Sequence, residues 1–143
     1  MKTFIPKEKD INRKTYLIDA TGKTLGRLAA RAASLLIGKG KTCFAKDQLV
    51  GDQVIIINAS KIHVTGKKKN QKVYTSFTGF VGGLQSITLE KLLEKKPTEV
   101  ITKAVTRMLP KNRIGDVMAK RLRVFPGAEY KHKAQKPTQI EVN

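Results

Sequence analysis

The spacing of apolar residues changes along the chain, and the changes predict strands that alternate with helices. Residues 15–20 (TYLIDA) form a short β-type run that ends in a Thr-Gly turn. From Leu25 onward the apolar residues recur every three or four positions, which predicts the apolar stripe of an amphipathic helix. Thr24 stands at the N-cap position of this helix, and Gly38 stands where a C-cap glycine belongs. A strand, a tight turn and a helix in this order begin a βα unit.

The middle of the chain contains the longest continuous apolar run. Residues 51–58 (GDQVIIIN) are β-branched at successive positions, which is typical of a strand covered on both faces in a parallel sheet. Residues 61–65 fit a helical turn or a strand equally well, and residues 66–72 (GKKKNQK) are expected to form a basic loop. Residues 73–77 and 84–88 are two weaker strand candidates on either side of the segment TGFVGG.

Helical spacing returns in the last third of the chain. Thr88 can cap the segment LEKLLEK, and Pro97 lies at a favoured first-turn position of a second helix that Pro110 ends. A short third helix is expected to begin at Asp116 as its cap and to run through Arg123. The alternation of strands and helices predicts an α/β layered domain with a mostly parallel sheet.

The length of 143 residues predicts a single domain over residues 1–143, large enough to bury a core. Residues 1–14 are polar and charged and are expected to form an arm. Residues 15–125 are expected to form the α/β core. Residues 126–143 follow a Pro-Gly break, show no periodicity and are expected to form a tail.

The charge of the chain restricts its partners more than its fold. The net charge is +18, from 29 basic and 11 acidic residues, which predicts strong and salt-sensitive attraction to polyanions. No acid occurs in residues 20–46 or 53–89, whereas residues 85–103 carry Glu and Lys at spacings that pair on a helix. The balanced helix is therefore an ordinary solvated surface, and the acid-free stretches are candidates for contact with phosphate groups. The residues predicted to make these contacts are Lys23, Arg27, Arg31, Lys39, Lys41, Lys67, Lys68, Lys69, Arg107, Lys111, Arg113, Lys120, Arg121, Arg123, Lys131, His132 and Lys133.

The choice among polyanions follows from the apolar residues. The apolar stripes are needed in the core, which disfavours an amphipathic membrane-binding helix. Aromatic residues make up 6% of the chain, with no Trp, which disfavours a platform that stacks single-stranded bases. Tyr74, Phe77 and Phe80 are expected to pack in the core. Folded RNA or duplex DNA, bound through backbone and shape, remains as the expected partner.

Catalytic and metal sites find little support in the sequence. The stretch TGKTLGR ends like a phosphate-binding loop, but Leu17 occupies the position where such a loop needs its first glycine. What remains is a glycine turn at the start of a helix, whose free amides suit a phosphate group. His63 and His132 are too far apart in sequence to suggest a metal site, and the single Cys43 excludes an internal disulfide. We expect no enzymatic activity, no cofactor and no metal; a small nucleotide-using enzyme and a DNA-coating protein remain the alternatives.

Several stretches together resemble one known family. They are IDATGKTLGRLA (18–29), GDQVIIINASKIHVTGKK (51–68), GGLQSITLEKLLEKKP (82–97), KAVTRMLPKN (103–112) and PGAEYKHKAQKP (126–137). By these stretches the chain resembles the bacterial-type large-subunit ribosomal protein L-thirteen family. It departs from the family pattern at Ser76-Phe77, at Phe80-Val81 and at Asp116, among other positions.

The resemblance implies a three-layer α/β/α domain with a four-stranded, mainly parallel sheet. It also implies binding to large-subunit ribosomal RNA, a role early in subunit assembly, neighbouring large-subunit ribosomal proteins as partners, and a place in the cytoplasmic ribosome. No membrane and no small-molecule substrate is expected as a partner.

Overall fold

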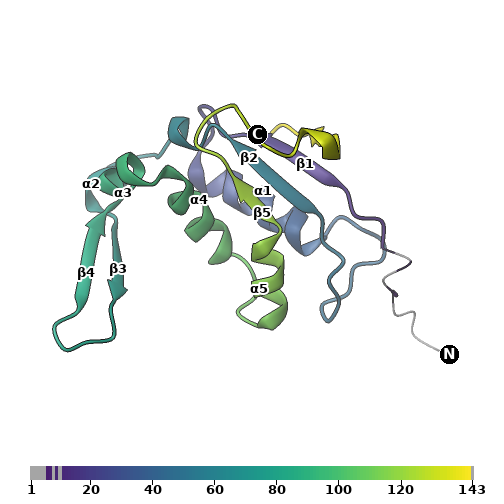
Figure 1. Ribbon diagram of the computed structural model, residues 1–143, viewed down its shortest axis with the longest axis horizontal. Coiled ribbons are helices and arrows are strands. Elements are labelled where there is room, and N and C mark those ends of the chain that lie inside the picture. The colour runs from purple at the N-terminus through teal and green to yellow at the C-terminus, as the bar shows by residue number, and fades with distance from the viewer. Residues whose placement is uncertain (1–5, 8, 10, 143) are drawn as a thin grey trace.

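The computed structural model describes residues 6, 7, 9 and 11–142 and shows an α/β fold with one long hairpin that projects from its body (Figure 1). The strands are β1 (Thr15–Asp19), β2 (Gln53–Ile57), β3 (Val73–Phe77), β4 (Leu84–Thr88), β5 (Leu122–Val124) and β6 (Thr138–Gln139). The α-helices are α1 (Leu25–Ile37), α2 (Lys68–Gln71), α3 (Leu89–Lys95), α4 (Pro97–Thr106) and α5 (Arg113–Lys120), and two 3₁₀-helices are η2 (Ala59–Lys61) and η3 (Lys133–Gln135).

The main sheet has four strands in the order β5-β2-β1-β6, and every neighbouring pair in it is parallel. The two central strands pair along their whole length, from Thr15 opposite Gln53 to Asp19 opposite Ile57. The four-stranded parallel sheet flanked by helices confirms the predicted fold class.

The alternation of side chains along the strands separates the two faces of the sheet. Ile18 lies opposite Ile56 in the register, and both are buried in the cluster that includes the apolar stripes of α1 and α4. Ile55 points to the other face and is only 1% exposed, because the C-terminal segment with η3 covers that face beside it. The apolar run of β2 is therefore covered on both faces, as its sequence predicted.

Helix α1 confirms the helix predicted from the apolar stripe. Gly38 has φ 82° and ends the helix in the left-handed conformation, with its amide donating to the carbonyls of Ser34 and Leu35. Thr24 occupies the N-cap position, but its side chain makes no capping hydrogen bond, and the first turn of the helix carries no acidic residue.

Helix α5, the last of the predicted helices, differs from the prediction in both its cap and its end. The cap is Asn112, whose side-chain oxygen accepts from the amide of Gly115 at 2.8 Å, so the prediction of Asp116 as the cap was wrong. Helix α5 ends at Lys120, and the chain then forms β5, in which Arg123 lies opposite Ile55 of β2. The prediction of a helix through Arg123 was wrong because pairing with β2 overrides the local helical pattern.

The two weaker strand candidates are confirmed as β3 and β4, which form a separate antiparallel hairpin and do not join the main sheet. Tyr74 is buried at 4% exposure, as expected, but Phe77 and Phe80 are 65% and 78% exposed. The expectation that these two phenylalanines pack in the core was therefore wrong, since they lie on a hairpin that extends beyond the body of the protein (Figure 1).

The segments between and beyond these elements also acquire structure. The expected basic loop 66–72 contains the single turn α2, and residues 61–65 form the end of η2 followed by a parallel bridge between His63 and Thr24. The segment expected to be a tail supplies β6 to the edge of the main sheet. The expected arm, residues 1–14, lies partly outside the described residues.

Candidate nucleic-acid interface

The residues predicted to contact phosphate groups are mostly on the surface. Lys23, Lys41, Arg121 and His132 are partly buried, whereas the others are exposed: Arg27, Arg31, Lys39, Lys67, Lys68, Lys69, Arg107, Lys111, Arg113, Lys120, Arg123, Lys131 and Lys133. In the part of the chain that the structure describes, Lys41 alone among these residues forms an ion pair with a carboxylate. Most of the predicted contact residues therefore present a positive charge that the protein itself does not neutralise.

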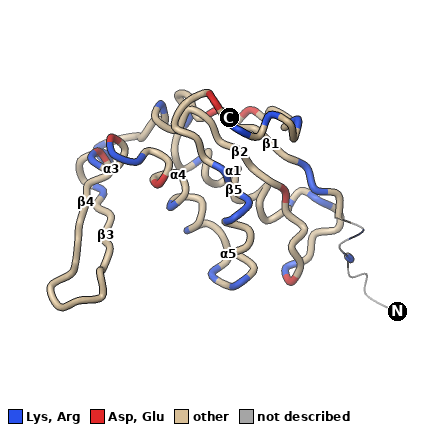
Figure 2. Tube along the Cα trace, in the orientation of Figure 1, with Lys and Arg blue, Asp and Glu red and all other residues tan. Residues whose placement is uncertain are grey.

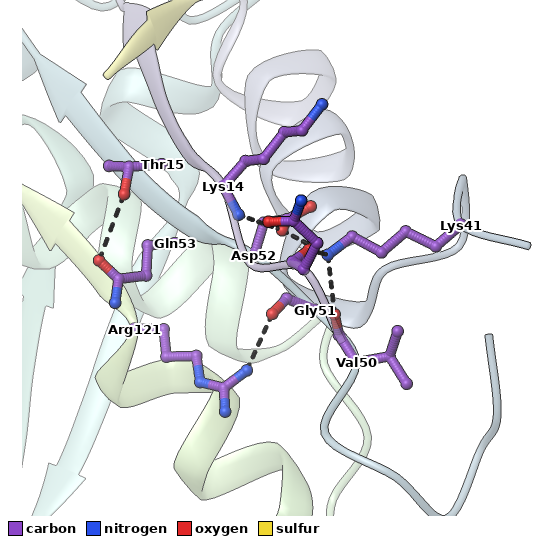
Figure 3. Close-up of polar contacts among 9 residues, drawn as sticks. Lys14, Thr15, Lys41, Val50, Gly51, Asp52, Gln53 and Arg121 are labelled. Atoms are coloured by element: carbon purple, nitrogen blue, oxygen red, sulfur yellow. Dashed lines mark hydrogen bonds and ion pairs between the residues drawn. The ribbon is translucent and has the colours of Figure 1, made fainter. Parts of the chain in front are cut away.

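Lys41 is the exception, and its position is structural (Figure 3). Its ammonium nitrogen lies 2.5 Å from a carboxylate oxygen of Asp52, whose side chain is 4% exposed, and it also donates to the carbonyls of Asn12 and Val50 at 2.7 and 3.1 Å. The same Asp52 oxygen accepts from the amide of Lys14 at 2.8 Å. Because all three donors of the ammonium group are used within the fold, we leave Lys41 out of the contact set proposed below.

Arg121 is bound to the fold at one side of its guanidinium. Its Nη1 donates to the carbonyl of Gly51 at 2.9 Å (Figure 3). Burial is the main cause that lowers the pKa of Arg121, the charge of Arg13 lowers it further, and the charge of Asp52 acts in the opposite direction. The guanidinium remains protonated at physiological pH, because its ordinary pKa is far above that range.

One group of predicted residues meets on the face of the sheet opposite α1, and we call it the β5 cluster: Lys120, Arg121, Arg123 and His132. These four residues line a cavity of about 270 Å³ together with Gln53 and Gln135. Arg123 reaches this face because it lies opposite Ile55 in the sheet register, so its side chain points away from the α1 side. His132 belongs to the C-terminal segment, and its ring centroid lies 6.1 Å from that of Phe125.

A second group surrounds the first turn of α1. Lys68 and Arg107 line a cavity with Lys72, which was not among the predicted contact residues. The side chains of Lys72 and Arg107 both lie over the ring of Tyr74, at 5.3 and 5.6 Å from its centroid. The basic run 66–72 was the available signal for Lys72, but its approach to Arg107 depends on how α2 packs against α3 and α3 against α4.

The remaining predicted residues are more dispersed. Arg31 and Lys41 share a cavity of about 570 Å³ with Lys14, another basic residue that the prediction missed. Lys111 and Arg113 line a cavity of about 430 Å³ at the start of α5. The other predicted residues lie outside the cavities described above, and they are Lys23, Arg27, Lys39, Lys67, Lys69, Lys131 and Lys133.

The described residues contain neither a metal site nor a membrane-spanning helix. No group of three or more His, Cys, Asp or Glu side chains lies close enough there to hold a metal ion. Within the same residues, none of the helices has both the length and the apolar character that a membrane span requires.

Comparison with known proteins decides the family. The family model of Ribosomal protein L13 matches residues 13–131. The chain belongs to this family. It is 50% identical over 142 residues to large ribosomal subunit protein uL13 of Finegoldia magna, and 53% identical over 142 residues to that of Aquifex aeolicus, with 99% of each chain covered in both cases. It is 52% identical over 137 residues to the uL13 protein of Clostridioides difficile, with 96% of each chain covered.

Membership of the L13 family confirms the resemblance seen in the sequence and makes this chain a ribosomal protein and not an enzyme. The distribution of charge agrees with that membership. Lys and Arg occur over much of the body of the protein, whereas residues 73–88 of the projecting hairpin carry no charged side chain (Figure 2).

Proposed function

We propose that this chain is a structural constituent of the large ribosomal subunit that binds large-subunit ribosomal RNA through phosphate-neutralising Lys and Arg side chains. In this proposal the protein binds early in subunit assembly and remains in the cytoplasmic ribosome. The names of its relatives, which are large ribosomal subunit proteins, support the setting.

The observation that carries the proposal is the set of exposed cations without carboxylate partners. Among the described residues, ion pairs join Glu99 of α4 to Lys103 and to the N-cap residue Lys96, so that helix is locally neutralised. The β5 cluster and the basic residues around α1 have no such partner in the described part of the chain, apart from Lys41. Like charges held at these positions repel one another, and phosphate groups of an RNA relieve that repulsion.

The proposed contact set comprises the predicted residues without Lys41, centred on the β5 cluster. Pairing with β2 places Arg123, and the hydrogen bond to the carbonyl of Gly51 places Arg121, so the protein presents these cations in a defined arrangement to folded RNA. Neighbouring large-subunit proteins are proposed as further partners, with residues 1–14 and 126–143 at the two ends of the chain as their contacts.

The decisive experiment follows the chain in a cell extract sedimented through sucrose with magnesium. We expect it to travel with the large subunit and to stay there in moderate salt, because many phosphate contacts hold it. Migration with free protein under these conditions would overturn the proposal.

A competition between large-subunit ribosomal RNA and duplex DNA at matched salt tests the alternative of a DNA-coating protein. We expect the RNA to win. In the same assay the double variant Lys120→Gln/Arg123→Gln should weaken RNA binding, whereas Lys91→Gln, an exposed lysine of α3 outside the contact set, should not. Equal affinity for both nucleic acids would favour the DNA-coating protein.

A further inference from the structure

A cavity of about 240 Å³ opens beside the first turn of α1, and we call it the α1 pocket. One side of it is apolar and is formed by Leu25, Val64, Leu89, Ala104 and Met108. Its volume is below the range of about 300–1,000 Å³ usual for sites of drug-sized ligands. The pocket therefore has room for one small group.

The other side of the α1 pocket is polar and lacks acceptors. The hydroxyl oxygen of Thr24 is buried and has no hydrogen-bond partner among the described residues. In the same part of the chain, the amides of Gly26 and Arg27 have no acceptor either, because the Thr24 side chain does not cap the helix. Buried polar groups in proteins nearly always have partners, so the unpaired Thr24 hydroxyl, next to the free amides of the exposed residues Gly26 and Arg27, indicates a missing ligand. The positive end of the helix dipole favours an anionic one.

Three basic side chains complete the polar side: Lys68, Lys72 and Arg107. Lys72 and Arg107 both lie over the ring of Tyr74, as does Lys103. The hydroxyl of Tyr74 is itself buried without a partner within the described residues. None of the three basic side chains has an ion pair with a carboxylate in this part of the chain, so their mutual repulsion is not relieved by the protein.

We propose that the α1 pocket binds one unpaired nucleotide, with its phosphate at the start of α1 and its base against the apolar wall. The inference rests on the proposed function, because folded RNA presents such nucleotides in loops and bulges. A phosphate of a paired strand would satisfy the amides of Gly26 and Arg27 but would leave the apolar side of the pocket without a partner, where Met108 is 44% exposed. A nucleotide satisfies both sides, since a base has an apolar face and an attached anion.

The test uses the purified full-length chain and three small probes: AMP, adenosine and inorganic phosphate. We expect AMP to shift the amide NMR signals of Gly26 and Arg27. AMP should also bind about tenfold more tightly than adenosine, which lacks the phosphate, and than inorganic phosphate, which lacks the base. A short single-stranded RNA should shift the same signals, and the same RNA with abasic sites should not do so as strongly. Tighter binding of AMP than of the RNA would identify a free nucleotide as the ligand, and the reverse order would identify a polynucleotide.

Matched variants distinguish binding in the α1 pocket from non-specific attraction of an anion to the positive charge of the protein. Ala104→Met fills the apolar wall without a change of charge, and Lys72→Met removes one exposed cation at the rim. Each should weaken binding of AMP and of the short RNA about tenfold, whereas Lys91→Met, at an exposed residue of α3 that does not line the pocket, should leave both unchanged. If Ala104→Met disturbs folding, Lys72→Met carries the test.

Two results would overturn the inference. One is inorganic phosphate or abasic RNA that binds as tightly as its base-bearing counterpart. The other is an equal loss of affinity in Lys72→Met and Lys91→Met. Binding of large-subunit ribosomal RNA, measured in parallel, separates this failure from failure of the proposed function, because the many other phosphate contacts do not depend on the pocket.

Discussion

At the scale of single residues, the packing of β2 against α1 depends on the absence of one side chain. A Cβ atom added to Gly51 would lie 1.6 Å from the carbonyl oxygen of Leu36. The backbone amide of the next residue, Asp52, donates to the carbonyl of Leu35 at 3.1 Å, and its carboxylate forms an ion pair with Lys41. The close approach at Gly51 therefore places Asp52 where it joins the helix end, the Lys41 loop and the start of β1.

The substitution Gly51→Ala should destabilise the protein by about 2–4 kcal/mol, because two backbone segments would have to separate to admit the methyl group. The measurement is the free energy of unfolding in urea. Gly40→Ala is the matched control, since a Cβ atom there meets nothing within 4 Å. A loss at Gly51 no greater than the loss at Gly40 would contradict the packing described here.

Asp19 is a second residue whose surroundings have a measurable consequence. Burial raises its pKa, but hydrogen bonds from the Asn58 side chain and from the amide and hydroxyl of Thr21, with the charge of Lys61, outweigh burial and hold the pKa below its ordinary value. The hydrogen bonds from Asn58 and from the Thr21 amide are both 2.9 Å long. Since Asn58 follows β2 and Asp19 ends β1, the carboxylate ties the two central strands together at their ends.

A carboxyl group with a lowered pKa in the folded state stabilises the fold above its unfolded pKa, and this stabilisation is lost as the pH falls through the folded pKa. The unfolding free energy of Asp19→Asn should therefore lie below that of the native chain at neutral pH, and the difference should shrink below about pH 4. Urea unfolding of both proteins at several pH values measures it. A difference that stays constant down to acid pH would contradict the assigned cause.

At the scale of elements, α5 and β5 show how a short segment takes its structure from its neighbours. Helix α5 has eight residues, from Arg113 after the Asn112 cap to Lys120, and a single residue, Arg121, separates it from β5. A Cβ atom on Gly115 would lie 1.8 Å from the carbonyl oxygen of Pro110, so the chain folds tightly back at the helix start. The tight start fixes the direction of α5 and delivers Leu122 to its place opposite Val54 in the sheet.

The cap of α5 can be tested with two substitutions four residues apart. Asn112→Ala should reduce stability by about 1 kcal/mol, because it removes the acceptor for the amide of Gly115. Asp116→Ala, which removes the residue that the sequence suggested as the cap, should have a smaller effect, limited to its interaction with the helix dipole. Thermal unfolding compares the two. The opposite order would restore Asp116 as the cap.

At the scale of the whole molecule, the charged side chains and the projecting hairpin occupy different regions. The projecting hairpin β3–β4 is uncharged, whereas the body carries the cations that are proposed to contact RNA (Figure 2). Strands β5 and β6 at the two edges of the sheet bring the C-terminal half of the chain next to its first half, and the β5 cluster forms at one of these junctions.

The salt dependence of RNA binding measures how many of these cations act together. For about ten phosphate contacts, the logarithm of the association constant should fall with the logarithm of the salt concentration at a slope of about −7 to −9. Removing one contact, as in Arg123→Gln, should reduce the slope by about one unit. Filter binding with large-subunit ribosomal RNA at several salt concentrations gives both slopes. A slope that Arg123→Gln and similar variants leave unchanged would remove those residues from the contact set.

The sequence by itself determined the family, the class of fold, the helices α1 and α4 and the two central strands, because these features depend on local periodicity, caps and motif residues. Gly38 and Pro97 are examples, since each requires only its own backbone conformation at a helix end. The sequence also determined the excess of positive charge that favours a polyanionic partner.

Only the tertiary structure decided which distant residues meet. It placed Leu122–Val124 in the sheet and left the hairpin outside it, turned Lys41 inward to Asp52, and brought Lys72 to Arg107 at the start of α1. The physical reason is that short strands and long flexible cations have weak local preferences. Their positions are set by hydrogen bonds and charges contributed by segments far away in the chain, which no local pattern contains.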